Sequence, residues 1–180
     1  ARGGGPDTEG EGSMRLCNFI VRDAVIPALA AASPGGRDPA TIRAVKEQVV
    51  REMVGALHAA GHFRAGDVDE VVRAVLKRED LGTTGIGRHI AIPHSRHPAA
   101  DRLIGTLALS RDGLPFDSLD GEPVYVFVLL VSPQDRPGDH LRALEAVVRT
   151  MRNDEFVRQL RACQTREEVW ALLEGAAPGW

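Results

Sequence analysis

Two stretches in the first half of the chain carry apolar residues at the spacing of an amphipathic α-helix. From Thr41, one apolar stripe continues until Gly61, formed by Ile42, Val45, Val49, Met53 and Leu57. A second helix is expected from Asp67, because its carboxylate can cap the first turn while Glu70 completes a capping box. The apolar positions of this helix follow the cap at Val71, Val72 and Val75.

The last third of the chain predicts three further helices. The stripe of the first follows Pro137 and consists of Leu141, Leu144, Val147, Val148 and Met151. A shorter stripe follows, formed by Phe156, Val157 and Leu160. Thr165 with Glu168 is the capping pattern of a final helix.

Strand signals lie between the two groups of helices. Residues 90–92, 103–109 and 124–131 are apolar, and they are separated by turn residues at 111–113 and 120–121. Helices before and after such a sheet favour a three-layer α/β or α+β sandwich, in which helices flank a mixed β-sheet, over a barrel or a bundle. Of the two we expect α/β.

Composition limits the number of domains and the class of protein. The chain has 180 residues, of which 43% are hydrophobic and 26% charged, and this suits one globular domain. Residues 1–13 contain five glycines and no hydrophobic periodicity, so we expect a flexible tail or a cloning remnant there. Residues 14–180 are then expected to form a single domain.

Charge and cysteine content exclude several classes of function. A net charge of −3 argues against a protein that mainly wraps nucleic acid. The two cysteines, Cys17 and Cys163, are too few for a disulfide framework, which favours the reducing cytoplasm. The longest apolar run, 124–131, is far shorter than the roughly twenty residues of a membrane helix, so no direct membrane insertion is expected.

Reactive side chains are densest in residues 78–94. The glycines at 82, 85 and 87 allow a tight backbone, and the hydroxyls of Thr83 and Thr84 add donors, so this loop could cradle a phosphate. The loop lacks the lysine of a P-loop, and its glycines do not follow a strand and open a helix. Nucleotide binding is therefore disfavoured.

His94 has the setting of a nucleophile. A short apolar strand leads to it, and Pro93 stiffens the backbone immediately before it. A neutral imidazole can capture a phosphoryl group on a ring nitrogen. Candidates to stabilise the resulting charge are Arg78, Arg88 and Arg96, while His140 could hydrogen-bond the phosphate or the partner ring.

The histidines of this chain are also compatible with roles outside phosphoryl transfer. His89, His94 and His97 could together bind zinc or nickel, although no cysteine or carboxylate sits at ligand spacing. A histidine after a strand is more often a surface residue than a catalyst. His140 could be an ordinary polar residue in the first turn of a helix.

The stretch 78–94 resembles a known phosphorylation-site signature. It reads Arg-Glu, then Gly-Thr-Thr-Gly-Ile-Gly, then Ile-Ala-Ile-Pro-His, and it is similar to the type-2 enzyme IIA domains of the bacterial phosphotransferase system (PTS). These are the fructose, mannitol and nitrogen-regulatory enzyme IIA proteins. The resemblance covers about residues 14–173 and includes Gly-Leu-Pro-Phe-Asp at 113–117 and Asp139-His140-Leu141.

The resemblance implies a phosphocarrier with an α/β sandwich fold. His94 matches the histidine that accepts phosphate from the carrier HPr and passes it to a cysteine of an enzyme IIB or uses it for regulation. His140 matches the second active-site histidine, and Arg78 matches the arginine beside the site. The resemblance implies neither a metal nor another cofactor. The surrounding surface should be a transient protein interface, and Ile86, Arg88 and Arg96 are candidates for its rim.

Two departures from the family pattern bear on partner choice. His89 stands where members often carry glycine, and Ser95 stands where glycine is common after the active histidine. The chain carries no attached enzyme IIB or HPr segment, which favours the nitrogen-regulatory branch over a fused sugar transporter. The alternative function is a catalytically idle module that binds regulatory partners with the same surface. The oligomeric state stays open.

Overall fold

Strand β5 (Val124–Ser132) is the central strand of a five-stranded mixed sheet in the computed structural model, which describes residues 14–176. On one side it pairs antiparallel with β4 (Ile104–Leu114). On the other it pairs parallel with two short strands in succession, β2 (Ile90–Ala91) and β3 (His94–Arg96). Strand β1 (Gly85–Gly87) adds an antiparallel edge to β2. The predicted mixed sheet is confirmed.

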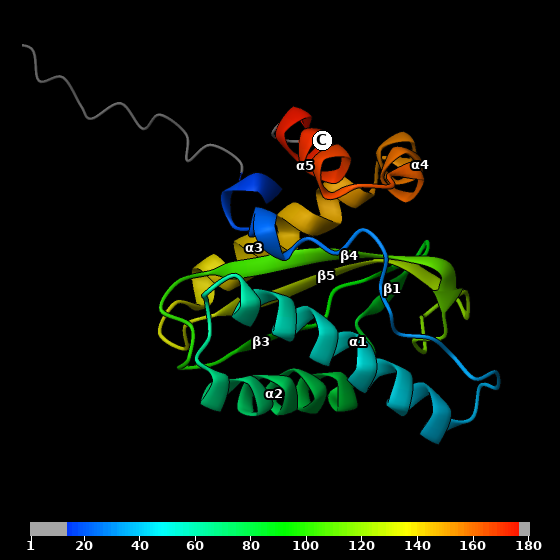
Figure 1. Ribbon diagram of the computed structural model, residues 1–180, viewed down its shortest axis with the longest axis horizontal. Helices are drawn as coiled ribbons and strands as arrows, with labels where there is room; N and C mark the ends of the chain where they lie inside the picture. The colour runs from blue at the N-terminus through cyan, green and yellow to red at the C-terminus, as the bar shows by residue number, and fades with distance from the viewer. Residues whose placement is uncertain (1–13, 177–180) are drawn as a thin grey trace, which may run out of the picture.

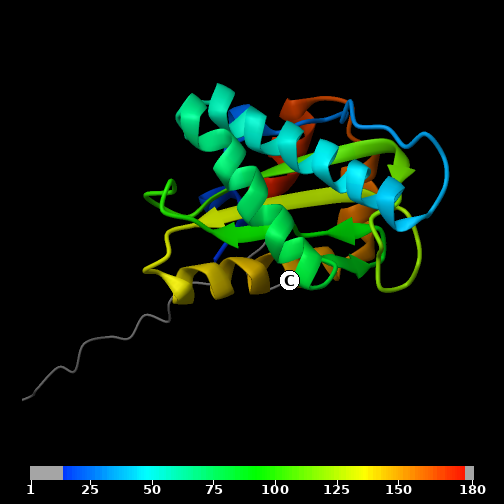
Figure 2. The same cartoon turned by 90° about the horizontal axis from the view of Figure 1, so that it is seen from below.

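Helices cover both faces of this sheet and form the three predicted layers (Figure 1). Helices α1 (Pro39–Ala59) and α2 (Val68–Leu81) lie against one face. Helices α3 (Pro137–Met151), α4 (Asp154–Ala162) and α5 (Arg166–Gly175) lie against the other. Seen from below, α1 and α2 run side by side across the strands (Figure 2). The α/β sandwich is confirmed.

The apolar run of β5 explains why helices are needed on both faces. Successive side chains of a strand point to opposite faces, so an uninterrupted apolar strand must be buried on both. Val126, Val128 and Leu130 join one cluster with α3, α4 and α5. Phe127 and Leu129 join the other cluster with α1 and α2.

The segment before α1 extends the sheet, although the sequence pattern assigned no element there. Two short 3-10 turns, Leu16–Asn18 and Arg22–Ala24, alternate with isolated bridges to β4. Ile20 pairs with Gly105, and Ile26 pairs with Ala108, both in parallel orientation. Apolar residues in this segment have no regular period of two or 3.6 residues, so the sequence pattern indicates neither a strand nor a helix there.

Two local predictions are wrong. The side chain of Asp67 makes no capping hydrogen bond, because a third 3-10 turn (Ala65–Asp67) leads into α2 and gives Asp67 helical backbone angles. The expected turn at 111–113 instead lies within β4, as an irregularity of register between Leu109 and Leu114. The predicted cap of α5 is present, since the Thr165 hydroxyl accepts a hydrogen bond from the Glu168 amide.

Two further expectations concern the N-terminal residues and insertion into a membrane. The expected tail at 1–13 lies outside the described residues. Among residues 14–176, no helix has the length and apolar character needed to cross a bilayer.

Candidate functional site

His94 is held in place by the strand that begins with it. It is the first residue of β3, it pairs with Leu130 of β5, and its side chain is half-buried. Its Nδ1 lies 2.7 Å from the carbonyl oxygen of Ile92. A carbonyl oxygen only accepts hydrogen bonds, so Nδ1 must carry the proton. The other ring nitrogen, Nε2, then keeps its lone pair and is the nucleophilic atom.

The surroundings of His94 keep the imidazole uncharged. Burial lowers its pKa from the ordinary value of 6.5, and the nearby Arg78 guanidinium lowers the pKa further. The hydrogen bond to Ile92 and the charge of Glu79 act in the opposite direction. The net effect is a lowered pKa, so His94 is neutral, and available as a nucleophile, near neutral pH.

His140 approaches His94 from the first turn of α3. The two ring centroids are 5.3 Å apart, with 55° between the ring planes. Its Nδ1 lies 2.6 Å from the hydroxyl oxygen of the fully buried Ser132, at the end of β5. Burial, followed by the neighbouring His94 and Arg96, lowers the pKa of His140 from 6.5 to about 4. His140 is therefore also neutral near pH 7.

Two arginines give the pocket around these histidines a positive charge. An open pocket of about 510 Å³ is lined by Arg78, His94, Ser95, Arg96, Gln134 and His140. Arg78 donates one hydrogen bond to the carbonyl oxygen of Gly82, at 2.8 Å, which orients its guanidinium at the end of α2. The three residues identified as site candidates, His94, His140 and Arg78, thus line one pocket. It combines two neutral imidazoles with two cations, and this set suits a dianionic phosphoryl group.

A buried ion pair organises the loop that precedes His94, and sequence reasoning missed its basic member. Lys46 of α1 lies 2.9 Å from Glu79 of α2, and both side chains are almost fully buried. Glu79 also accepts hydrogen bonds from the amide and the hydroxyl of Thr84, at 3.0 and 2.5 Å. The burial of Lys46 could have been predicted from its position, because it lies four residues after Ile42 and therefore on the apolar stripe of α1.

This network corrects the expected role of the loop hydroxyls. Thr84 donates to Glu79, and Thr83 donates to the carbonyl oxygen of Phe116 at 3.0 Å. Both hydroxyls therefore hold the loop to its own surroundings, and neither Thr83 nor Thr84 lines the pocket of His94. The expectation that they cradle a phosphate is wrong.

Arg88 does not join His94, contrary to expectation. Its guanidinium pairs with Asp154 at the start of α4 and donates to the carbonyl oxygen of Arg152. The candidate rim residue Ile86 is 40% exposed on β1. Leu81, three residues after Arg78 at the end of α2, and Leu141, next to His140 in α3, are 81% and 57% exposed. Exposed apolar side chains next to a reactive group are typical of a protein contact surface.

The three histidines considered as a metal site lie in separate surroundings. His89 Nδ1 lies 2.7 Å from the carbonyl oxygen of Pro123, and His97 Nδ1 accepts a hydrogen bond from the Ala99 amide. Within residues 14–176, no group of three or more histidine, cysteine or acidic side chains is placed to hold a metal ion. The structure does not bring His89, His94 and His97 together.

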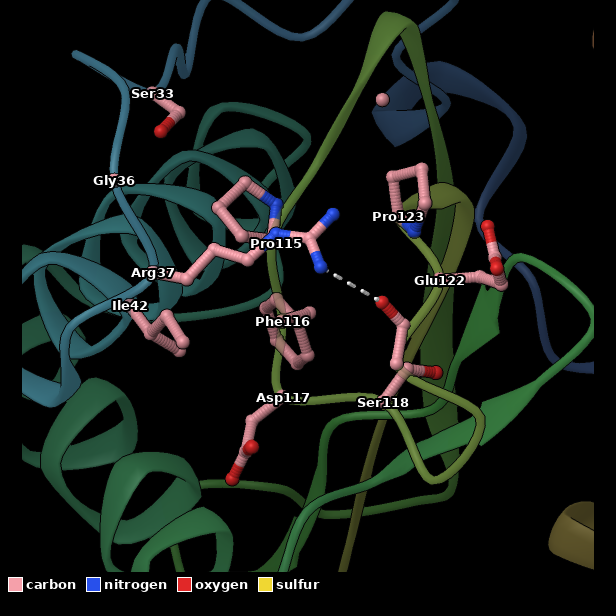
Figure 3. Close-up of a pocket in the computed structure, with 12 residues that line it drawn as sticks. Ser33, Gly36, Arg37, Ile42, Pro115, Phe116, Asp117, Ser118, Glu122 and Pro123 are labelled. Atoms are coloured by element: carbon pink, nitrogen blue, oxygen red, sulfur yellow. Dashed lines mark hydrogen bonds between the residues drawn. The ribbon is translucent and has the colours of Figure 1, made fainter.

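A separate pocket lies between the loop before α1 and the loop between β4 and β5 (Figure 3). It measures about 370 Å³, and Arg37 reaches across it to the carbonyl oxygen of Gly121. Phe116 and Ser118 line its wall. It shares no lining residue with the pocket of His94 and contains no histidine. The lining of this pocket therefore offers no imidazole nucleophile.

The low pKa of His140 gives a first testable prediction. The folded protein holds the pKa of this group at about 4, whereas the unfolded chain binds the proton near 6.5. Its contribution to stability is therefore complete above about pH 6.5 and is lost as the pH falls towards about 4. We expect the ring resonances of His140 in NMR spectra to titrate with a midpoint near 4. The His140→Gln variant identifies those resonances by their loss, and a midpoint at the ordinary value would contradict the assigned environment.

Comparison with known proteins places this geometry in context. Residues 41–176 match the family model described as phosphoenolpyruvate-dependent sugar phosphotransferase system, EIIA 2. A nitrogen regulatory protein of Bradyrhizobium diazoefficiens is 29% identical over 160 residues, which cover 89% of this chain and 95% of that protein.

Two solved structures share the fold. The crystal structure of nitrogen regulatory protein IIA-Ntr from Neisseria meningitidis aligns with a TM-score of 0.71 and 24% identity, covering 87% of this chain and 97% of that one. Enzyme IIAMTL, solved in complex with phosphorylated enzyme IIBMTL from Escherichia coli, aligns with a TM-score of 0.64 and 18% identity. That alignment covers 87% of this chain and 99% of the matched chain.

Proposed function

Because the chain belongs to the EIIA 2 family of the phosphoenolpyruvate-dependent sugar phosphotransferase system, we propose that it is a phosphocarrier that holds the phosphoryl group on Nε2 of His94. The observation that most directly supports this proposal is the hydrogen bond from His94 Nδ1 to the Ile92 carbonyl oxygen. It leaves Nε2 as the nucleophilic nitrogen. His140 and the two arginines beside it support the same assignment.

In the proposed transfer, Nε2 of His94 attacks the phosphorus of a phosphohistidine on the donor protein. The new N–P bond forms as the donor's N–P bond breaks, and the donor nitrogen keeps the electron pair of that bond. The His94 ring becomes positively charged, and the Ile92 carbonyl stabilises this charge through Nδ1–H. Most of the catalytic effect then comes from positioning and from charge stabilisation.

Arg78 and His140 have distinct roles in this proposal. The Arg78 guanidinium attracts the phosphoryl oxygens as they arrive, since it lines the pocket with His94. His140 is neutral, so it can donate only one ring hydrogen. If the Ser132 hydroxyl donates to Nδ1, the hydrogen of His140 sits on Nε2 and is available to a phosphoryl oxygen. Ser132 is then a positioning residue for His140.

The partners follow from the chemistry of the two half-reactions. The donor in this proposal is an HPr-like phosphocarrier, and the acceptor is a cysteine of an enzyme IIB or a regulatory target protein. The solved complex of the similar enzyme IIAMTL with phosphorylated enzyme IIBMTL supports a IIB acceptor. The exposed Leu81 and Leu141 give a partner apolar surface near His94. The proposal takes 14–180 as one cytoplasmic domain and requires no metal or nucleotide cofactor.

The experiment is intact-mass analysis after incubation with phosphoenolpyruvate, enzyme I and HPr. A phosphocarrier gains one acid-labile phosphoryl group, and it loses that group when a cognate enzyme IIB is added. A chain that stays folded but gains no phosphoryl group with a cognate donor is instead the idle, partner-binding module. Labelling that a IIB acceptor does not discharge would favour a purely regulatory use of the phosphoryl group.

A further inference from the structure

The turn between β1 and β2 has an unfavourable backbone conformation for its residues. Arg88 and His89 are the two residues between the strands, and their φ angles are +57° and +69°. Two-residue hairpins with positive φ at both central positions strongly prefer Asn-Gly, because a bulky side chain is crowded there. Residues held in such conformations cluster at functional sites. The side chains of Arg88 and His89 are therefore candidates for a functional contact.

Both side chains line a pocket that the phosphocarrier function does not use. The pocket has a volume of about 550 Å³ and lies between this turn and α4. It shares no lining residue with the pocket of His94. Its volume is that of a site for a metabolite-sized molecule.

Positive charge is concentrated in this pocket although the whole chain is acidic. Four arginines line it, namely Arg88, Arg111, Arg158 and Arg161, against a single acidic lining residue, Asp154. Asp154 pairs with Arg88, and Glu155 just outside the lining pairs with Arg158. Four guanidinium groups therefore face two carboxylates. A ligand with at least two negative charges would balance them.

The arginines keep most of their hydrogen-bond donors free. A guanidinium has five N–H donors. Arg111 uses one nitrogen on the carbonyl oxygen of Cys163, at 2.6 Å. Among residues 14–176, the Arg161 guanidinium has no hydrogen-bond or ion-pair partner, and its Cζ lies 3.9 Å from the Tyr125 ring centroid. This cation–π contact holds the guanidinium without consuming its donors.

The remaining walls are suited to an organic group. The Tyr125 ring has Arg161 on its face and makes a T-shaped contact with the His89 ring, whose centroid lies 5.3 Å away. Val157 and Ala162 add apolar surface from α4. A bare inorganic ion would leave these walls uncovered, whereas an organic body attached to the charged group would cover them.

We propose that this second pocket binds a small organic phosphate. Its phosphate oxygens would take the free donors of Arg111, Arg158 and Arg161, whose planar guanidinium groups match phosphate geometry. Its organic body would lie against Tyr125 and Val157. The inference stands independently of phosphoryl transfer at His94, and its test needs no phosphoryl donor.

Calorimetric titration of the full chain tests this site with ADP, fructose 1,6-bisphosphate and inorganic pyrophosphate. We expect at least one organic phosphate to bind at least about tenfold more tightly than pyrophosphate. The Arg158→Gln/Arg161→Gln variant should weaken that binding at least about tenfold. The matched control is Arg102→Gln, which removes an exposed positive charge outside the pocket and should leave binding unchanged. The proposal is overturned by no binding of either organic phosphate, by equal affinity for pyrophosphate, or by equal effects of the two variants.

A second variant separates loss of binding from loss of folding. The change Arg88→Asn/His89→Gly removes two lining side chains and gives the turn its preferred residues. We expect its thermal unfolding midpoint to equal or exceed that of the original protein. Its affinity for the organic phosphate should fall at least about tenfold, because Asp154 loses its cation and then repels the phosphate from the pocket wall. A stable variant that kept full affinity would overturn the proposal.

Discussion

Replacing His94 with alanine is expected to abolish the phosphoryl adduct formed with phosphoenolpyruvate, enzyme I and HPr. The reason is that His94 Nε2 is the proposed nucleophile, so its removal leaves no atom for the N–P bond. His140→Ala keeps the nucleophile and loses only one donor, so it should still be labelled, about a hundredfold more slowly. Intact mass measured over time distinguishes the two variants.

The control for this prediction is His62→Ala, because His62 lies outside the pocket of His94. It should be labelled at the rate of the original protein. Circular dichroism must show that all three variants are folded. An adduct that persists in His94→Ala would move the phosphorylation site to another residue and contradict the assignment.

The second large effect is expected on stability, from Lys46→Met. This change leaves the carboxylate of Glu79, which is 3% exposed, without its cation. Removing one partner of a buried ion pair typically costs about 3–5 kcal/mol, and the two hydrogen bonds from Thr84 favour the lower end of that range. Urea denaturation should therefore show a loss of about 3 kcal/mol in the free energy of unfolding.

The chain offers a matched control, because Lys77 is its other lysine and is exposed. Lys77→Met should change the free energy of unfolding by less than about 0.5 kcal/mol. The double variant Lys46→Met/Glu79→Gln should recover more than half of the loss, since it also removes the buried charge. Equal effects of Lys46→Met and Lys77→Met would show that the buried pair does not stabilise the fold.

The layers of the fold could be predicted because their signal is local. The continuous apolar run of β5 requires cover on both faces, and the stripes of α1 and α3 supply it. Turn chemistry was more ambiguous, because glycines at turns and at bulges look alike in a sequence. Gly113 has φ +78° inside β4, and a Cβ there would lie 2.7 Å from Cζ of Tyr125. The Asp112-Gly113 pair, which is typical of a turn, therefore lies in an irregular part of strand β4.

The site residues could be predicted only where residues that are close in the sequence, or that follow neighbouring strands, are also close in the fold. His94 and Arg78 belong to one short stretch, and His140 follows the neighbouring strand β5, so all three reach the same end of the sheet. Arg88 is closer to His94 in sequence than Arg78 is, but the hairpin turn points it to α4. Lys46 comes from a distant helix and meets Glu79 only through packing of α1 on α2. Such long-range contacts leave little trace in a single sequence.

The most direct test of the central claim is to identify the phosphorylated nitrogen by NMR. The 15N-labelled protein is phosphorylated through HPr, and the one-bond coupling between 15N and 31P is assigned to a histidine and to a ring atom. We predict coupling at Nε2 of His94, with Nδ1 still protonated and hydrogen-bonded to Ile92. Coupling at Nδ1 of His94, or at any other histidine, would contradict this mechanism.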